Sequence, residues 1–576
     1  MKLSGGEIVV RALEDEGIHL AFGIPGTHNI ELYDALASSE RVRPILVTDE
    51  QAASFMADAV WRASGAIGCA NLVPGAGLTH ALSGIAEAFM DCVPMLVLGC
   101  GVRNDTGKAY QLHDIDQLAV VAPVVKARFR PGRGQELYTT IRRACQLARE
   151  GRPGPVMVEV PANLYLSRHD VDLVPPPVPL ENPNALPGHE EIERIAALLG
   201  DAKRPLLYLG LGAAPAGSDL VALAERLEAP VTTTFQGKGV FPESHPLFLW
   251  NGFGAAAPPF VRSIVAGCDA TLAIGCRFGE VATASYGLEP PQPLIHADID
   301  PAVPGRNFPA EVAITADSAA FVPALLERLE QRSPDAALRD AIRAGHEAVW
   351  HDWLAEVGGE RVTPAFLLRE LQRRFGPDAI FVTDSGNGTF LAMECLRLDR
   401  PGHYLAPVDY SCMGYAVPAA VGAKLACPDA PVLALAGDGA FLMTGLELLT
   451  AAAHGVAIAV LVLRDGELAQ IAQFQSTALS RKTASRLPDY DLAALCDAVG
   501  VRHLRLDADG EVPHVLEEAA GELDAGHTVV VEVAIDYSRK TFFTRGVVRA
   551  NLRRLPWADR IRFVGRAVGR RVVATR

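Results

Sequence analysis

Short apolar runs alternate with longer amphipathic segments along most of this chain. PVLALA (431–436) and VAIAVLVL (456–463) have the length and composition of buried strands. Between them, FLMTGLELLTAAAHG (441–455) repeats apolar residues every three or four positions, as a helix does. Strands that alternate with helices in this way are typical of parallel sheets with helices on both faces. The pattern predicts the α/β class, with three doubly wound parallel-sheet domains.

The alternation is interrupted at a few places, which we interpret as domain boundaries. We predict a first domain over residues 1–170, a linker over 171–188, a central domain over 189–338, a third domain over 360–536 and a C-terminal tail over 537–576. The linker contains the proline-rich run LVPPPVPLENPNALPG, which favours an extended chain. The first and third domains share a loose plan of strand, glycine-bearing loop and helix.

Length, cysteine content and the N-terminal sequence narrow the class of protein. A chain of 576 residues with 49% hydrophobic residues predicts a fully folded protein with more than one core. Its ten cysteines contain no Cys-x-x-Cys pair, which argues against a disulfide framework or a zinc site and fits a reducing cytosol. The N-terminus has acidic residues before any long apolar run, unlike a signal peptide, and no apolar run is long enough for a membrane span. We therefore predict a cytoplasmic protein.

The net charge of −15 is unevenly distributed along the chain. Residues 539–576 contain twelve Arg or Lys against a single acid, Asp559, so the rest of the chain carries about −26. A body with that charge is not expected to bind nucleic acid. The tail segment WADRIRFVGRAVGRRVVATR has the pattern of a basic amphipathic helix, which can contact a membrane surface or an acidic protein surface. We favour docking on the protein's own acidic body over a membrane surface.

A lone carboxylate between two glycines follows the strand-like run 431–436. Gly437, Asp438 and Gly439 form the turn between a strand end and a helix start, where free N–H groups suit a phosphate and glycines allow a close approach. The carboxylate itself does not favour a phosphate, but it can hold a hard cation that bridges to phosphate oxygens. Taken alone, Gly-Asp-Gly is also compatible with an ordinary turn.

A second acid occurs where a second ligand is needed. Asp465 follows the strand-like run 456–463 and lies 27 residues after Asp438, a spacing that fits one strand–helix–strand crossover. Such a crossover brings both acids to the same edge of the sheet, where α/β folds bind ligands. Together the two acids predict a Mg²⁺ site that carries a diphosphate, with Arg464 as a counter-charge.

This pair of motifs resembles the signature of thiamin diphosphate (ThDP) enzymes, and the chain is similar to their acetolactate synthase (acetohydroxyacid synthase) branch over residues 1 to about 535. The resemblance implies a pyrimidine-binding first domain, a Rossmann-like central domain similar to FAD-carrying domains, and a diphosphate-binding third domain. It implies that Mg²⁺ is held by Asp438, Asp465 and the backbone carbonyl of Glu467. Asp465 departs from the asparagine that is usual in the family.

Further cofactor contacts follow from the same resemblance. The stretch VTDSGNGTF resembles the family's other diphosphate loop, and DYSCMGYAVPAAVGA resembles the stretch that holds the aminopyrimidine, with Met413 as the bulky residue that bends the cofactor. The predicted cofactor-binding residues are Gly386, Asn387, Gly388, Ser411, Met413, Gly437, Asp438, Gly439, Ala440, Asp465 and Glu467.

Glu50 begins the amphipathic segment EQAASFMADAVWRASG directly after a strand-like run. An acid at that position is commonly explained by the helix dipole alone. The resemblance instead implies that Glu50 is the carboxyl group that activates the cofactor's pyrimidine ring, for which a dry pocket is needed. In the family the first and third domains face each other across a subunit interface, so we expect a homo-oligomer, a dimer or a tetramer. His80 occupies a position where the family usually has asparagine.

Residues of the substrate pocket are also suggested by the resemblance. Gln111 matches a family glutamine that contacts the substrate, and His113 is either a proton relay or an ordinary loop residue. Thr27 and His28 lie where related decarboxylases have polar groups, and Phe474 corresponds to a tryptophan that selects the second keto acid.

Three departures from the family's sequence pattern concern the binding of the acceptor substrate and of the flavin. Ala162 replaces a lysine of acetolactate synthases, and Val281 replaces the arginine that binds the second keto acid's carboxylate, a contact that valine does not make. The loop WNGFGAAAPPF lacks the usual Met-His-Gly, so an empty central domain is favoured over bound FAD.

We predict Mg²⁺/ThDP-dependent decarboxylation of a 2-oxo acid with carboligation. The alternatives are a non-ligating decarboxylase and a catalytically silent binding or regulatory homologue.

Overall fold

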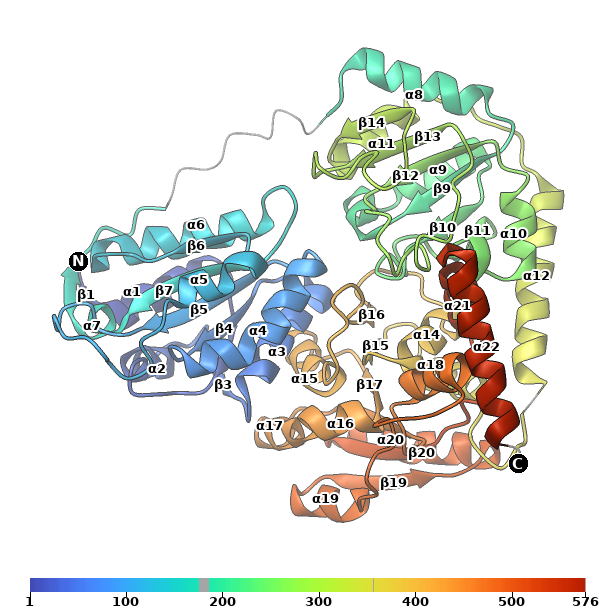
Figure 1. Cartoon of the computed structure of the whole chain (residues 1–576). Coiled ribbons are helices and arrows are strands. Elements are labelled where there is room, and N and C mark those ends of the chain that lie inside the picture. Colours follow the sequence, from blue (N-terminus) through green and yellow to red (C-terminus); the bar gives the residue numbers. More distant parts are fainter. Residues whose placement is uncertain (176–185, 356, 575–576) are drawn as a thin grey trace.

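The computed structural model describes residues 1–175, 186–355 and 357–574. Its main features are three six-stranded parallel sheets, each covered by helices, which Figure 1 shows as three separate lobes. This arrangement confirms the predicted fold class. A small antiparallel pair, β1 (Lys2–Ser4) with β8 (Arg168–Asp170), ties the N-terminus to the end of the first domain. The middle of the predicted linker, residues 176–185, lies outside the described residues.

The first domain has the strand order β3-β2-β4-β5-β7-β6. Its strands are β2 (Leu20–Gly23), β3 (Arg43–Leu46), β4 (Gly68–Leu72), β5 (Met95–Gly101), β6 (Ala127–Phe129) and β7 (Val156–Pro161). Its helices are α1 (Gly5–Asp15), α2 (Ile30–Ala37), α3 (Glu50–Ser64), α4 (Ala76–Met90), α5 (Gln117–Val121), α6 (Leu137–Arg149) and α7 (Ala162–Leu166).

The third domain repeats that topology with the order β16-β15-β17-β18-β20-β19. Its strands are β15 (Ile380–Thr383), β16 (Tyr404–Leu405), β17 (Val432–Gly437), β18 (Ala459–Arg464), β19 (Arg502–Leu506) and β20 (Val529–Ala534). Its helices are α13 (Pro364–Phe375), α14 (Asn387–Cys395), α15 (Ala416–Ala426), α16 (Asp438–Thr444), α17 (Leu448–Ala453), α18 (Ala469–Leu479), α19 (Leu492–Ala498) and α20 (Val512–Asp524).

The central domain has a different order, β11-β10-β9-β12-β13-β14, in which all strands are parallel and the direction of strand addition reverses between β9 and β12. Such a reversal point is where open parallel sheets bind ligands. Its strands are β9 (Pro205–Leu209), β10 (Val231–Thr233), β11 (Phe248–Asn251), β12 (Ala270–Ile274), β13 (Leu294–Asp298) and β14 (Val312–Thr315). Its helices are α8 (His189–Asp201), α9 (Asp219–Leu227), α10 (Pro259–Val265), α11 (Ser318–Leu326) and α12 (Ala336–Leu354).

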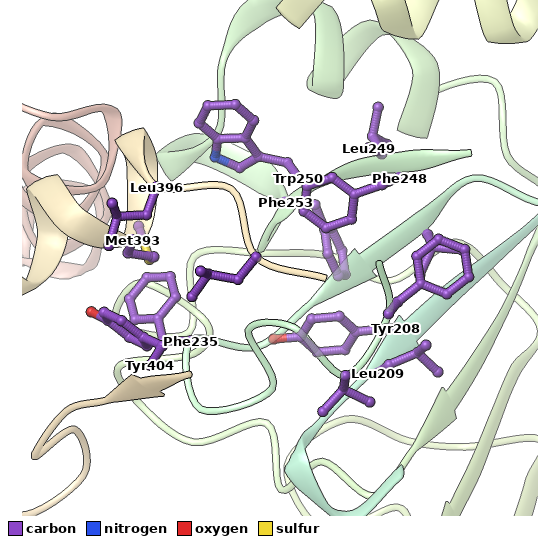
Figure 2. Close-up of a cluster of buried hydrophobic side chains, with 14 of the residues drawn as sticks. Tyr208, Leu209, Phe235, Phe248, Leu249, Trp250, Phe253, Met393, Leu396 and Tyr404 are labelled. Carbon is purple, nitrogen blue, oxygen red and sulfur yellow. The ribbon is translucent and has the colours of Figure 1, made fainter. Parts of the chain in front are cut away.

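One hydrophobic core continues from the central domain into the third domain. Figure 2 shows Phe235 and Tyr404 on one side of this core and Tyr208 and Trp250 on the other. Burial of such aromatic side chains removes a large apolar area from water and fixes the two sheets relative to each other.

The basic tail folds back over the molecule as two helices, α21 (Phe542–Arg554) and α22 (Trp557–Ala574), drawn in red in Figure 1. α21 packs so closely on the central domain that a Cβ on Gly546 would lie 2.3 Å from Ala256 Cα. α22 packs on α18, and Arg570 donates a hydrogen bond to the Leu479 carbonyl at 3.1 Å. No helix among the described residues is apolar over a length sufficient to cross a membrane.

Candidate active site

The loops that follow β17 and β18 meet at one carboxylate. These strands are neighbours in the parallel sheet, so their carboxyl ends lie at the same edge. Asp438 begins α16 directly after β17 and is 2% exposed. Its carboxylate accepts hydrogen bonds from the backbone N–H groups of Gly439, Asp465 and Gly466 at 2.9, 3.3 and 2.8 Å. The Asp438 side chain therefore joins the two loops.

Asp465 lies beside Asp438, directly after β18. Burial, and then the neighbouring charge of Asp438, raise the pKa of Asp465 to about 7. Burial also raises the pKa of Asp438. A divalent cation relieves the repulsion between two such carboxylates, and their oxygens are the hard ligands that Mg²⁺ prefers. The residues present therefore fit the predicted ion.

Two neighbouring side chains point to other partners. The Glu467 carboxylate contacts Lys482, and Arg486 at 3.7 Å, so its side chain is already paired with cations. The Arg464 guanidinium binds Glu532 at 2.6 Å and Asp489 at 2.9 Å. Arg464 is thus paired with other acids, but its charge also acts to lower the pKa of Asp438 against the larger effect of burial, so its role as a counter-charge stays a prediction.

The predicted second diphosphate loop lies at the same sheet edge, because β15 is the other neighbour of β17. Gly386 precedes α14 with a φ of 133°, a conformation that favours glycine. A Cβ on Gly388 would be 3.4 Å from the Leu463 side chain, which places this turn next to the end of β18. Asn387 begins α14, so the free N–H groups of that helix face the edge that carries Asp438.

Hydrogen bonds hold residues 411–414 against the loop that follows β15. Ser411 has a φ of 64°, and its hydroxyl lies 2.7 Å from the Ser385 hydroxyl. Asp384 accepts the Gly414 N–H at 2.9 Å and the Ala416 N–H at 2.8 Å. These contacts hold the segment that contains Met413, the residue predicted to bend the cofactor.

Glu50 is the first residue of α3 and is 7% exposed. His80 Nδ1 lies 3.5 Å from its Oε2 atom, and a Cβ on Gly77 would lie 2.7 Å from its Oε1 atom. Within the described residues the Glu50 carboxylate has no hydrogen bond and no contact with Asp438. The activating acid predicted from the sequence is therefore enclosed, yet separate from the metal edge of its own chain.

Four of the predicted substrate-side residues come from two loops of the first domain. The His28 and His113 rings are edge to face with centroids 5.5 Å apart, and Thr27 Oγ1 lies 3.2 Å from His28 Nδ1. Burial, followed by the His113 charge, lowers the pKa of His28. Gln111 donates a hydrogen bond to the Arg103 carbonyl at 2.8 Å within its own loop. Phe474 lies apart from these residues, on α18 of the third domain.

Comparison with known proteins supports these observations. Models described as thiamine pyrophosphate enzyme N-terminal TPP binding domain, central domain and C-terminal TPP binding domain match residues 3–120, 192–325 and 384–533, thiamine pyrophosphate being another name for ThDP. The chain is 32% identical to the acetolactate synthase large subunit of Corynebacterium glutamicum over 90% of this chain and 85% of that protein. It belongs to the acetolactate synthase family of thiamine pyrophosphate enzymes.

Other relatives align over a similar extent. Acetolactate synthase isozyme 3 large subunit of Escherichia coli is 30% identical, over 94% of this chain and 96% of that protein. The probable acetolactate synthase large subunit of Methanocaldococcus jannaschii is also 30% identical, over 90% of each chain. These alignments include all three sheets, which confirms the family that the motifs indicated.

The two residues predicted to change the acceptor site, Val281 and Ala162, lie in different domains. Val281 lies half-buried in the loop after β12. The nearby Arg277 donates to Asp409 at 2.5 Å and to the Met90 carbonyl at 2.6 Å, so its guanidinium is already paired. Ala162 begins α7 directly after β7. The effect of both departures on an acceptor stays a prediction.

A cavity of about 630 Å³ lies where the central domain, at the reversal point between β9 and β12, meets the first and third domains. Gly212, Arg277 and Asp298 are among the lining residues, and burial raises the pKa of Asp298 to about 6. The cavity has the size of a small-molecule site. The loop at residues 251–260, where the family has its Met-His-Gly, is not part of the lining. FAD thus remains a prediction that we do not favour.

Two residues near the cofactor segment were not predicted from the sequence. Asp384 follows β15 just as Asp438 follows β17, so its position at a strand end was an available signal. Glu87 accepts the backbone N–H of Cys412 from another domain, and no sequence pattern indicates that contact.

Proposed function

We propose that this protein is a Mg²⁺- and ThDP-dependent enzyme that decarboxylates a 2-oxo acid and ligates the retained acyl unit to an acceptor. One observation is the main support for the proposal. The Asp465 backbone N–H donates to the Asp438 carboxylate at one sheet edge, in a chain that aligns with an acetolactate synthase over 90% of its length. A silent homologue would be expected to have lost part of this pair.

The third domain would hold the cofactor by its charged end. Asp438, Asp465 and the Glu467 carbonyl are the oxygen ligands for Mg²⁺. The N–H groups at the start of α14, with those of α16 beyond the Gly439 N–H that Asp438 accepts, would bind the diphosphate oxygens, since helix N-termini attract anions. Bound ThDP would supply a cationic thiazolium ring that stabilises the electron pair left when CO₂ departs.

Glu50 would exchange a proton with the pyrimidine ring. Its largely buried position is the placement that this role requires. Because no described contact joins Glu50 to the Asp438 edge of the same chain, we propose that a second copy completes each site. The protein is then a homo-oligomer, a dimer or a tetramer, whose active sites lie between chains.

Substrate would be positioned by the loops that carry His28 and His113. Their paired rings and the Thr27 hydroxyl provide polar groups beside the Gly75 turn, because a Cβ on Gly75 would lie 2.8 Å from the His113 carbonyl oxygen. Gln111 orients the substrate carboxylate or the carbonyl oxygen. The relatives named as acetolactate synthases support a 2-oxo acid as the donor.

A non-ligating decarboxylase is the second candidate, and Val281 favours it. Without an arginine at that position, a second keto acid loses a charge-assisted contact for its carboxylate. A product assay separates the two functions: the holoenzyme is incubated with pyruvate or larger 2-oxo acids, with and without aldehyde acceptors. Ligated product supports the first proposal, and free aldehyde in every mixture supports the second.

A binding test distinguishes an enzyme from a silent homologue. ThDP with Mg²⁺ is expected to raise the melting temperature of both the wild type and Glu50→Gln, because the variant retains the metal edge. Only the wild type should turn over. A wild type that is stabilised by ThDP but inactive with every 2-oxo acid would refute catalysis.

A further inference from the structure

Helix α4 contacts two parts of the molecule that the proposed chemistry uses. Its first turn lies against Glu50 through Gly77 and His80. Its second half lies against the Ser411–Met413 segment of the third domain. One rigid helix of the first domain therefore contacts both the activating acid and the segment predicted to hold the pyrimidine ring.

The contact with the third domain depends on Glu87, which is 0% exposed. Its Oε2 atom accepts the Cys412 backbone N–H at 3.0 Å, and the Cys412 thiol donates to the Ser83 carbonyl at 3.3 Å. Glu87 Oε1 has no hydrogen-bond partner within the described part of the chain. Burial, and then the charge of Asp91, raise the pKa of Glu87 against the opposing effect of Arg62.

The segment that Glu87 contacts has an unusual backbone. Ser411 has a φ of 64°, in the left-handed region that serine rarely occupies. Contacts from two domains keep it there: Ser385 and Asp384 hold residues 411 and 414 from the third domain, and Glu87 holds residue 412 from the first. A buried carboxyl oxygen without a partner lowers stability. Packing alone does not call for an acid at this position.

We propose that Glu87 is a positioning residue for the Ser411–Met413 segment and that α4 links this segment to Glu50. The inference rests on the proposed function, since it concerns the pyrimidine end of ThDP. In the proposed oligomer Glu50 serves the site of a second chain, whereas residues 411–413 serve the site of their own chain. α4 then joins two neighbouring active sites.

The first test measures equilibrium binding of ThDP in the presence of Mg²⁺ by titration calorimetry. Glu87→Ala removes the acceptor of the Cys412 N–H and is expected to weaken ThDP binding about tenfold. Glu87→Gln retains an acceptor of the same shape and is expected to restore binding to within about twofold. The control Glu14→Ala removes another buried glutamate of this domain, which contacts Arg11, Ser39 and Arg41, and should leave ThDP affinity unchanged.

Unchanged affinity in Glu87→Ala would overturn the positioning role, and so would an equal loss in the Glu14 control. Glu87→Leu fills the same space without an acceptor, so it replaces the alanine variant if that variant does not fold. Because the readout is binding, it is separate from turnover. An inactive wild type with normal ThDP binding would refute the proposed function and not this role.

The second test is a double-mutant cycle on the ThDP dissociation constant with His80→Asn and Glu87→Ala. The two residues are seven positions apart on α4, about 10 Å along the axis, where independent changes normally add. If α4 links them, the double variant should differ from the product of the single effects by more than about threefold. Additive effects would overturn the link.

Discussion

The proposed sharing of active sites predicts that two inactive variants restore activity when combined. Glu50→Gln removes the proton-carrying carboxyl group, and Asp438→Asn removes a charged metal ligand. In a two-fold symmetric pair, each site takes Glu50 from one chain and Asp438 from the other. A hybrid of the two variants therefore has one site with both residues intact and one site with both residues changed.

The expected recovery follows from counting sites. Random assembly of equal amounts gives hybrids as about half of all pairs, each with one intact site of two, so the unfractionated mixture should reach about a quarter of wild-type activity and the isolated hybrids about a half. The variants are co-expressed with different affinity tags, hybrids are isolated through both tags, and CO₂ release from the 2-oxo acid is measured. Each variant expressed alone should be inactive, because it lacks one component at every site.

A matched control uses a chain that carries both changes. Mixed with the wild type, it forms hybrids in which every site has one changed residue, so about a quarter of full activity should remain, from wild-type pairs alone. If each chain contained its own complete site, the first mixture would stay inactive and the second would keep about half. Either of those results would refute the shared site.

Three further changes test separate parts of the structure. Gly77→Ala adds a Cβ 2.7 Å from Glu50 Oε1 and is expected to lower kcat about tenfold to a hundredfold. The circular dichroism spectrum should be unchanged, and an unchanged kcat would contradict the placement of Glu50. Burial raises the pKa of Glu87, so the folded state keeps a proton that the unfolded chain releases above pH 4.5, and the free energy of unfolding falls as pH rises from there. Glu87→Gln should therefore make Tm less dependent on pH. Equal slopes of Tm against pH in the wild type and the variant would argue against a neutral Glu87 carboxyl group. Gly546→Leu should displace α21 from Ala256 and so speed trypsin cleavage of the tail. The control is Gly521→Leu, because a Cβ on Gly521 would have no neighbouring atom within 4 Å. Equal cleavage rates in the two variants would argue against the packing of α21.

The strand ends of the third domain could be predicted because local pattern carries the necessary information. An apolar run followed by Gly437-Asp438-Gly439 marks the end of β17, and the crossover length places Asp465 at the end of the next strand. Glu87 could not be predicted in this way. It contacts Cys412, 325 positions along the chain, and its importance depends on which face of α4 meets another domain. Arg464 pairs with Glu532 on β20, and the residues around Arg464 likewise do not indicate that this strand lies beside β18.

The proposal of a second chain rests on how the first and third domains are fixed together. α15 packs on α3 so closely that a Cβ on Gly422 would lie 2.4 Å from the Met56 carbonyl oxygen. Beside this contact the buried Asp58 accepts hydrogen bonds from Arg62 and from the Tyr415 hydroxyl, each at 2.6 Å.

The Tyr415 hydrogen bond to the buried Asp58 carboxyl group crosses the two domains, and a hydrogen bond of this kind contributes about 1.5 to 3 kcal/mol, which resists their reorientation. Glu50 begins α3, so the same interface holds it in a fixed position relative to Asp438 of its own chain. Within the described residues no contact joins the two carboxylates. In the proposed oligomer, a two-fold partner presents the same two surfaces in reverse and so brings its Asp438 edge to the Glu50 of this chain.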